Sequence, residues 1–378
     1  MMIRRREFSL GVLGAMLAGC RTASPTTPPS KPESSLPDAP KRVLILGGTG
    51  FLGPALVEQC QAMNAEVTLF NRGKTRPHLF PELEKLRGDR NGDLSALEGR
   101  SFDWVLDTSG QIPRQVEASA GLLSQQAERY VFVSSISAYA NLSVPGVEEG
   151  GATIPMPEPY SEAMPQHYGA LKAGCERAAE AAMPGRATVV RPGLIVGPGD
   201  PTDRFTYWPT RVARGGDVVA PNSPDDPAQF IDVRDLAAFI LHTQATEQSG
   251  TFNVTGPTEA TTMGGLLDAC KTVTNSDAAF HWVPTPSLTK HGVAPWMELT
   301  VWVPPDDAEF GGMSRVSISK AVAAGLKTRA MQETIADTLA WWETLPEARR
   351  SRPRAGLASQ KEQAVLAALA ESQPSSAA

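Results

Sequence analysis

A tyrosine and a lysine four residues apart are the strongest candidates for chemistry in this chain. Tyr168 and Lys172 stand in the run YGALKAGCE, whose pattern predicts a helix, so both side chains lie on one face of it. Upstream, the run VFVSSISAY places Ser134 and Ser135 just past the end of a predicted strand. Because ligands gather at the carboxyl ends of the strands of an open parallel sheet, serine, tyrosine and lysine could converge there beside a ligand.

This set of residues is typical of proton transfer coupled to hydride transfer. A tyrosine acts as a base at neutral pH only if its pKa falls from about 10 to about 7, which corresponds to about 4 kcal/mol. We expect the ammonium group of Lys172 and the positive ring of an oxidised nicotinamide to lower the pKa of Tyr168. Tyr168 would then take a proton from a substrate hydroxyl, and Ser135 would orient the hydroxyl oxygen. Without a cofactor site, such a pair more often decorates a helix surface.

A cofactor site is predicted by the stretch VLILGGTGFLG at Val43–Gly53. An apolar strand pattern runs into Gly47, Gly50 and Gly53, and an apolar helical pattern follows at once, which is the context of a dinucleotide-binding fingerprint. Glycine at these points allows a tight turn and lets a pyrophosphate approach the backbone, while the helix N-terminus binds the anion. A tight turn that binds nothing is the alternative for the glycines alone.

The end of the second predicted strand, Val67–Phe70, bears on the choice of cofactor. The strand is followed by Asn71, Arg72, a glycine and Lys74, which provide two cations and no acid. An acid at this point meets the ribose of NAD, whereas a cation suits the extra phosphate of NADP. The sequence therefore favours NADP over NAD, unless Arg72 and Lys74 are only solvated loop charges.

Strand and helix patterns alternate through the body of the chain. They predict an α/β fold with a doubly wound parallel sheet, Rossmann-like, and a smaller C-terminal substrate-binding lobe. The further predicted strands are Trp104–Asp107, Tyr130–Ser134, Ala187–Val196 and Phe230–Val233. We expect an NAD(P)-binding domain over residues 41–345, with its lobe mainly in residues 198–227 and 252–312. Residues 346–378 would form a C-terminal helix and a disordered tail, with a solvated basic turn at Arg349–Arg354.

The N-terminal segment has the composition of an export signal. Arg5 and Arg6 before Phe8, a short apolar run and Leu17–Cys20 resemble a twin-arginine signal that ends in a lipoprotein lipobox. We expect residues 1–19 to be an export signal peptide and Cys20 to be lipidated, with residues 20–40, rich in Pro, Ser and Thr, as a tether. The protein would then be exported to the periplasmic side and lipid-anchored, or cytoplasmic if the signal is misread.

The composition limits the classes of partner that we expect this protein to bind. The 378 residues carry a formal net charge of −6, which gives no general attraction to nucleic acid or to anionic lipid. Cys60, Cys175 and Cys270 are far apart and lack metal-ligand spacing, so we expect buried thiols and no metal site. A small-molecule substrate is the expected partner, the membrane is reached only through the lipid anchor, and a homodimer is possible.

Taken together, the motifs resemble those of the extended short-chain dehydrogenases/reductases of the NAD-dependent epimerase/dehydratase group. The match runs from about Lys41 to Trp342. The segments that carry it are GGTGFLG at Gly47, GDR at Gly88, DTSG at Asp107, VSSISAY at Val133, YGALK at Tyr168, VVRPGLIVGPGD at Val189, QFIDVRDLA at Gln229 and FNVTG at Phe252.

The resemblance implies roles for individual residues. Ser135, chosen over Ser134 by counting back from Tyr139, would be catalytic together with Tyr168 and Lys172. Asp89 would contact the adenine, Phe51 and Leu52 would cover the pyrophosphate, and Pro192 would lie by the nicotinamide amide. The full set of implied cofactor-binding residues is Gly47, Thr49, Gly50, Phe51, Leu52, Gly53, Asn71, Arg72, Asp89, Ser109, Gly110 and Pro192.

The chain also departs from the pattern of this group. Nucleotide-sugar epimerases commonly carry an arginine just before the aromatic-Ile-x-Val-x-Asp segment to clamp the substrate's pyrophosphate, whereas this chain has Pro227, Ala228 and Gln229. A UDP- or GDP-sugar is therefore in doubt. Arg204 could bind a different anionic or hydroxylated substrate, or could form a structural ion pair with Asp203 or Asp200.

The expected function is that of an NAD(P)-dependent epimerase/dehydratase-type oxidoreductase acting on a sugar or related hydroxylated small molecule. An exported enzyme would have to carry its cofactor with it, and retention for hours implies a Kd of about 10⁻¹⁰ M. Each oxidation would then be followed by return of hydride within the same site. Two alternatives remain open: a reductase or dehydrogenase that exchanges NADP, and a non-catalytic dinucleotide-binding scaffold.

Overall fold

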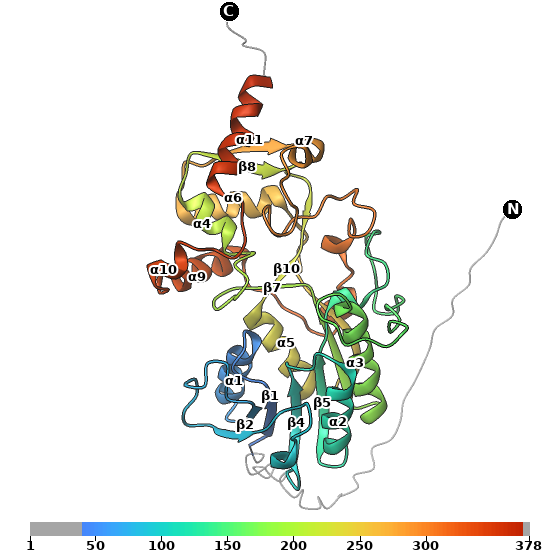
Figure 1. Ribbon diagram of the computed structural model, residues 1–378. Helices are drawn as coiled ribbons and strands as arrows, with labels where there is room; N and C mark the ends of the chain where they lie inside the picture. Colours follow the sequence, from blue (N-terminus) through green and yellow to red (C-terminus); the bar gives the residue numbers. More distant parts are fainter. Residues whose placement is uncertain (1–39, 373–378) are drawn as a thin grey trace, which may run out of the picture. The chain divides into compact units, whose positions relative to one another are not determined.

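The computed structural model describes residues 40–372, and its centre is a parallel sheet (Figure 1). The seven strands follow the order β11-β6-β5-β4-β1-β2-β3, and every neighbouring pair is parallel. Their bounds are β1 Arg42–Leu46, β2 Glu66–Asn71, β3 Glu84–Arg87, β4 Phe102–Asp107, β5 Ala127–Val133, β6 Ala187–Pro192 and β11 Gly250–Val254. The predicted signal peptide, the lipidation site at Cys20, the tether as far as residue 39 and the last six residues lie outside the described residues.

Helices cover both faces of this sheet. One face packs against α1 (Leu52–Ala62) and α5 (Val233–Ala245), and the other packs against α2 (Pro113–Leu123) and α3 (Tyr168–Ala182). The central strands are therefore buried on both sides, which explains their continuous apolar sequences. The predicted doubly wound Rossmann-like fold is confirmed.

A second body of structure has its own hydrophobic core, centred on the buried side chains Phe205, Trp208 and Trp302. The helices that build it are α4 Tyr207–Ala213, α6 Met263–Thr274, α7 Thr285–Lys290, α9 Met331–Glu343 and α11 Ser359–Ser372. Three two-stranded sheets accompany them: β7 Leu194–Val196 with β10 Phe230–Asp232, β8 Asp217–Pro221 with β13 Ala279–Val283, and β9 Pro227–Ala228 with β12 Thr261–Thr262. The remaining short elements are η1 Ser95–Leu97, η2 Ile136–Ala138, η3 Met313–Arg315, α8 Ser319–Ala323 and α10 Glu347–Arg350.

Two details of the predicted strands were wrong. Ala187–Val196 is not one strand, because the chain leaves the main sheet at Gly193 and continues as β7, which pairs with β10. A Cβ atom at Gly193 would lie 2.5 Å from Oγ1 of Thr255, so only glycine permits this close crossing. The edge strand β3 was missed because its sequence, EKLR, is mostly charged, as edge strands often are.

The three cysteines within residues 40–372 are buried and unpaired, as predicted. None of the helices in this part of the chain is both long and apolar enough to cross a membrane. Among the same residues there is also no group of three or more His, Cys, Asp or Glu side chains that could hold a metal ion.

Candidate active site

The glycine turn after β1 has the geometry of an anion-binding loop. Gly47 adopts a φ of +113°, which a side chain would disfavour, and a Cβ at Gly53 would lie 2.3 Å from the carbonyl carbon of Gly48. A Cβ at Gly50, in contrast, would meet nothing within 4 Å. Helix α1 begins directly after the turn without a side-chain cap, so its first N–H groups are free to face a ligand.

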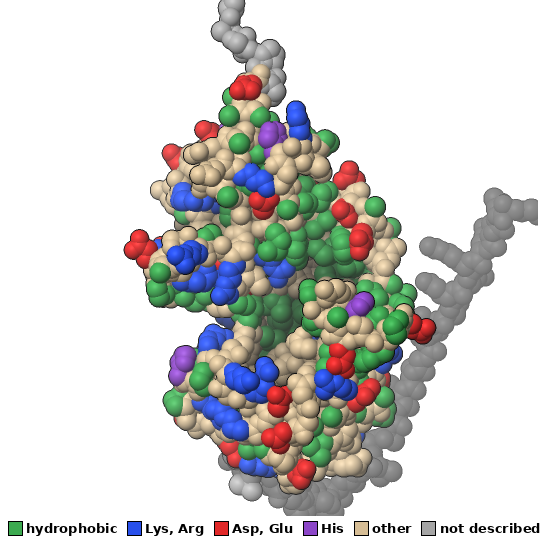
Figure 2. Space-filling model, in the orientation of Figure 1, with side chains coloured by type: hydrophobic (Ala, Val, Ile, Leu, Met, Phe, Trp, Pro, Cys, Tyr) green, Lys and Arg blue, Asp and Glu red, His purple; other side chains and the backbone are tan. Residues whose placement is uncertain are grey.

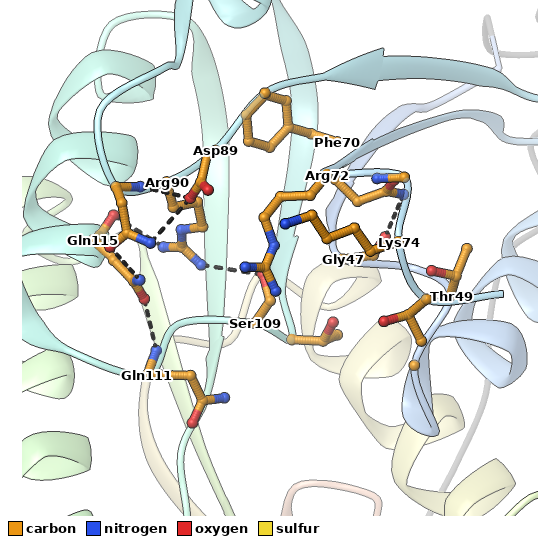
Figure 3. A pocket seen from close by; sticks show the side chains of 17 residues that line it. Gly47, Thr49, Phe70, Arg72, Lys74, Asp89, Arg90, Ser109, Gln111 and Gln115 are labelled. Atoms are coloured by element: carbon orange, nitrogen blue, oxygen red, sulfur yellow. Dashed lines mark hydrogen bonds between the residues drawn. The ribbon is translucent and has the colours of Figure 1, made fainter. Parts of the chain in front are cut away.

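This turn forms one wall of a pocket of about 270 Å³ (Figure 3). Seven of the twelve predicted cofactor-binding residues line it: Gly47, Thr49, Gly50, Asn71, Arg72, Asp89 and Ser109. The pocket also contains residues that the sequence analysis did not assign to it, namely Phe70, Gly73, Thr75, Gly88, Arg90, Asn91, Thr108, Gln111 and Gln115, together with Lys74. The pocket thus runs along the carboxyl ends of β1, β2 and β4.

The other five predicted residues lie beside this pocket. Leu52 is buried in the core against the sheet, so only its backbone is available to a ligand. Phe51 stays half-buried and lies 3.8 Å from where a Cβ at Gly199 would stand. Gly53 contacts the turn, Gly110 is tied to β4, and Pro192 ends β6.

Two cations project into the pocket from the end of β2. Arg72 extends across it toward Ser109, with Lys74 beside it (Figure 3). Within residues 40–372 neither side chain has a hydrogen bond or an ion pair, whereas Asn71 is occupied by bonds to the Gly47 carbonyl and the Gly73 amide. Hydrogen bonds from Asn91 and the charges of Arg72 and Lys74 lower the pKa of Asp89. The cations are therefore free to meet an anionic ligand group.

A buried ion pair shapes the opposite wall. Arg90 donates to both carboxylate oxygens of Asp107 at 2.5 and 2.8 Å, and neither side chain is more than 8% exposed. Asp107 also accepts the Tyr130 hydroxyl at 2.7 Å and the amides of Ser109 and Gly110 at 3.0 and 2.9 Å. Arg90 is thus neutralised, and its pairing fixes the loop that presents Ser109 to the pocket.

Arg76 is a second residue that the sequence analysis missed. Its Nε donates to the carbonyl oxygen of Thr49 at 3.0 Å, and its Nη2 donates to the carbonyl of Gly50. The guanidinium therefore holds the glycine turn from behind. No motif marks this residue, because its contact depends on how the loop after β2 folds back.

The structure brings the three predicted catalytic residues to the carboxyl end of β5. Ser135 caps η2, Tyr168 opens α3, and Lys172 lies one turn further along that helix. Tyr168 is half-buried, and the neighbouring Ser135 side chain lowers the pKa of its phenol. The Ser135 hydroxyl itself donates to the Ser137 hydroxyl at 3.1 Å. The serine and the tyrosine thus lie near each other at this strand end.

The neighbouring serine has a different task. The Ser134 hydroxyl donates to Glu176 at 2.5 Å, and Glu176 pairs with Arg191 at 2.6 Å in the protein interior. Ser134 is 4% exposed, and its hydroxyl is already hydrogen-bonded within this network. Ser135 is half-buried and its hydroxyl bonds only locally, to the hydroxyl and the amide of Ser137 at 3.1 Å, so it stays the candidate of the two for contact with a ligand.

Lys172 connects the cofactor pocket with the catalytic pair. Its buried Nζ donates to the Gly110 carbonyl at 2.9 Å and to the Val133 carbonyl at 2.6 Å, so it bridges the ends of β4 and β5. Burial lowers the pKa of Lys172 to about 8. An ammonium with two carbonyl partners keeps one N–H free for a further acceptor.

The electrostatics at Tyr168 differ from the expectation. Burial raises the pKa of Tyr168, while the hydrogen bond from Ser135 and the positive charge of Arg204 act in the opposite direction. Arg204 therefore contributes a positive charge near the phenol, and the ammonium of Lys172 is held by the carbonyls of Gly110 and Val133. This role of Arg204 was not predictable from the sequence, because Arg204 follows a loop whose course no motif indicates.

Arg204 forms neither of the ion pairs considered from the sequence. Asp203 pairs instead with Arg349 at 2.5 Å and accepts the Arg354 amide at 2.8 Å. Asp200 uses one carboxylate oxygen for the amide and hydroxyl of Thr202. The turn at Arg349–Arg354 is mostly exposed, as predicted, but Arg349 and the Arg354 amide also fasten the loop that carries Arg204.

Comparison with known proteins shows the family to which this chain belongs. The family model described as "NAD dependent epimerase/dehydratase family" matches residues 43–255, which is more than half of the chain. The chain belongs to the NAD-dependent epimerase/dehydratase family. The family resemblance inferred from the motifs is confirmed.

Individual relatives are distant. The chloroplast stem-loop binding protein of 41 kDa b of Arabidopsis thaliana is 28% identical over 61% of this chain, which spans 62% of that protein's length. The dTDP-6-deoxy-L-talose 4-dehydrogenase (NAD(P)(+)) of Kitasatospora kifunensis is 29% identical over 43% of this chain and 55% of its own. Among solved structures, UDP-glucose 4-epimerase of Thermus thermophilus in complex with NAD has a TM-score of 0.56 at 20% identity, covering 81% of this chain and all of that one.

One departure from the epimerase/dehydratase pattern has a structural explanation. Gln229, where nucleotide-sugar epimerases of this family carry a substrate-binding arginine nearby, exchanges hydrogen bonds of 3.0 and 3.1 Å with the backbone of Val316. The residue therefore joins two segments of the chain. It does not provide a charge for a pyrophosphate.

Proposed function

We propose that this chain is an NADP-dependent oxidoreductase of the epimerase/dehydratase type that acts on a hydroxyl group of a sugar or related small molecule. The observation that carries the proposal is the position of Lys172, which joins Gly110 beside the dinucleotide pocket to the strand end that carries Ser135. Ser135, Tyr168 and Lys172 would be the catalytic residues. Pocket and catalytic pair are then parts of one site.

The residues of the pocket fit a dinucleotide. The open turn at Gly50 and the uncapped start of α1 would hold the diphosphate, and Asp89 would lie at the adenosine end. Arg72 and Lys74 would meet the extra phosphate that distinguishes NADP from NAD. When bound, the nicotinamide supplies a hydride acceptor.

The protein's own part is proton transfer and orientation. The Tyr168 phenolate would accept the proton of the substrate hydroxyl, and the Ser135 hydroxyl would donate a hydrogen bond to the same oxygen. The free N–H of Lys172 would hold a hydroxyl of the cofactor's ribose. Since burial raises the pKa of Tyr168, the positive charge of Arg204 contributes to making the phenolate accessible.

The relatives support a reaction at a sugar hydroxyl. The Thermus thermophilus protein acts on UDP-glucose by its name, and the Kitasatospora kifunensis protein is named for a sugar nucleotide and for both NAD and NADP. Transferred to this chain, these names favour sugar-like substrates. They leave the nucleotide part of the substrate open, since Gln229 does not supply a cation.

The cofactor preference is tested by titrating NADP and NAD into the protein and measuring both dissociation constants by calorimetry. We expect NADP to bind more tightly, and the Arg72→Gln variant to lose about tenfold or more in NADP affinity while its NAD affinity stays within twofold. Lys327→Gln, which removes an exposed lysine outside the pocket, is the matched control. Equal losses for both nucleotides would contradict the role given to Arg72.

The proposal includes export and a redox-neutral cycle, on the strength of the N-terminal sequence. A lipid-anchored enzyme without access to a nucleotide pool would retain its cofactor and return the hydride within one site. Mass spectrometry of nucleotide released from denatured, freshly purified protein tests this part. If no nucleotide were released, and added NADP bound only at micromolar levels or weaker, the retained-cofactor scheme would be wrong and an exchanging reductase would be favoured.

A further inference from the structure

We propose that Arg204, stacked on Trp296, is the substrate-recognition residue of this site and binds a carboxylate or phosphate group carried close to the reacting hydroxyl. The inference rests on the proposed function and names the chemical class of its substrate. That class is a hydroxylated small molecule bearing a compact anionic group.

The guanidinium of Arg204 lacks a carboxylate partner. Within residues 40–372 its side chain has one hydrogen bond, from Nε to Oγ1 of Thr202 at 3.2 Å, and no ion pair. Its terminal nitrogens are not among the fully buried atoms that lack a partner, so they still reach the surface. A half-buried arginine with two free terminal groups has donors in the fork geometry that suits a carboxylate or a phosphate.

The charged groups near Arg204 do not satisfy it. Asp200 acts on it electrostatically but lies beyond ion-pair distance, and one carboxylate oxygen of Asp200 is buried without a hydrogen-bond partner. Asp203 is saturated by Arg349 and Arg354. The positive charge of Arg204 also lowers the pKa of Tyr168. The loop that carries Arg204 approaches the cofactor turn, since a Cβ at Gly199 would lie 3.8 Å from the Phe51 ring, so this loop lies beside the proposed reaction site.

Trp296 contacts the Arg204 side chain, and the two side chains together are called the cradle below. The Arg204 guanidinium lies 5.0 Å from the centre of the Trp296 ring, within the range of a cation–π contact. Trp296 adopts a φ of +66°, an unfavourable conformation for a bulky residue, and its amide is held by the carbonyls of Leu299 and Trp302. Strained residues of this kind cluster at ligand sites, where the surrounding structure maintains them.

One segment of the chain fixes both halves of the cradle. Residues 349–361 hold the Arg204 loop through Asp203, and they hold the Trp296 loop through an ion pair of 2.7 Å between Lys361 and Glu298. The Gly356 amide also donates to the Met297 carbonyl at 2.8 Å. The two side chains are thus kept in place by the same neighbour, as a preorganised binding site requires.

Arg204 and Tyr168 are both partly exposed, so a small anionic substrate could reach them from solvent. Gly199, five residues before Arg204, approaches Phe51 at the cofactor turn. Figure 2 shows that one face of the molecule is hollowed, with hydrophobic side chains in the floor of the hollow and Lys and Arg side chains near its rim.

Tyrosine NMR provides a local test, because the chain has only five tyrosines. Protein labelled with ¹³C at the phenol carbon is titrated, without nucleotide and at constant ionic strength, with inorganic phosphate and separately with acetate. The Tyr168 signal is assigned by its loss in Tyr168→Phe. We expect a saturable change of this signal in the wild type, and at least about a tenfold rise in the half-saturating concentration in Arg204→Gln.

A control variant separates this site from other cations. Arg214→Gln removes an exposed charge from the lobe and should leave the Tyr168 response unchanged. Arg204→Lys keeps the charge without the fork and should show a smaller loss than Arg204→Gln, and it serves as the test if Arg204→Gln fails to fold.

The outcomes are distinct. A response to phosphate alone assigns phosphorylated substrates, and a response to acetate assigns carboxylated ones. No saturable response to either anion, or the same half-saturating concentration in the wild type and in the Arg204 variants, would overturn the inference. Failure of NADP binding in the separate calorimetric titration would instead refute the proposed function, because the NMR samples contain no nucleotide.

Discussion

The two sides of the candidate site differ in whether their shielded arginine has a carboxylate partner. On the cofactor side, Arg90 is enclosed and neutralised by Asp107, and the free cations Arg72 and Lys74 stand in an open pocket. On the substrate side, Arg204 is half-buried and has no carboxylate, while its neighbour Asp203 is bound elsewhere. The comparison teaches that a buried ion pair can form part of a pocket wall, whereas a half-buried charge without an ion-pair partner is available to a ligand.

The largest expected effect concerns the catalytic pair that lies between these two sides. Tyr168→Phe removes the proton acceptor and should lower kcat by about 10³-fold, with little change in nucleotide affinity. Turnover is followed by substrate-dependent nicotinamide absorbance or, for an epimerisation, by NMR of the sugar. Tyr160→Phe, which alters an exposed tyrosine bound to Glu162, is the control. If Tyr168→Phe kept most of the activity, the scaffold hypothesis would gain support.

A smaller effect is expected from opening the neutralised pair on the cofactor side. Asp107→Asn leaves the Arg90 charge buried without a counter-charge and should lower the free energy of unfolding by about 3 kcal/mol or more, measured by urea denaturation. Glu84→Gln breaks an exposed pair with Arg100 and should cost less than about 1 kcal/mol. Similar losses in both variants would mean that the buried pair does not shape the wall.

The smallest effect is expected from weakening the contacts that hold the Arg204 loop in place. Asp203→Asn weakens the contacts to Arg349 and Arg354 and should lower the free energy of unfolding by about 1–2 kcal/mol. It should also raise KM more than it lowers kcat, since the Arg204 loop would be less fixed. Asp217→Asn, at an exposed pair with His281, is the control and should change neither quantity measurably. An unchanged KM in Asp203→Asn would show that the anchor is not needed for substrate binding.

The sequence predicted one side of the site far better than the other. The sheet, the glycine turn and the residue choice of Ser135 over Ser134 followed from short motifs whose residues are neighbours in the chain. Arg76 and the Arg204–Trp296 contact were not predictable, because they join loops that meet only through tertiary packing. The prediction of one strand over Ala187–Val196 failed for the same reason, since the chain crosses close to Thr255, about sixty positions away, at Gly193.

The proposed preference for NADP depends on two cations, Arg72 and Lys74, whose lack of partners could not be established from the sequence. In the fold, Asn71 takes the local hydrogen bonds after β2. The basic run at Arg349–Arg354 is a different case. Most of it is exposed, as the sequence indicated, but the charge of Arg349 and the backbone amide of Arg354 bind Asp203.

The segment 349–361 has a consequence for how substrate choice could change during evolution. It contacts the loops of Arg204 and Trp296 through Asp203 and Glu298, although its residues stand well over a hundred positions from the proposed catalytic motifs. Substitutions in this remote stretch could retune which molecules are accepted while the chemistry stays intact. Libraries for redesigning specificity should therefore include the end of the chain as well as the mouth of the sheet.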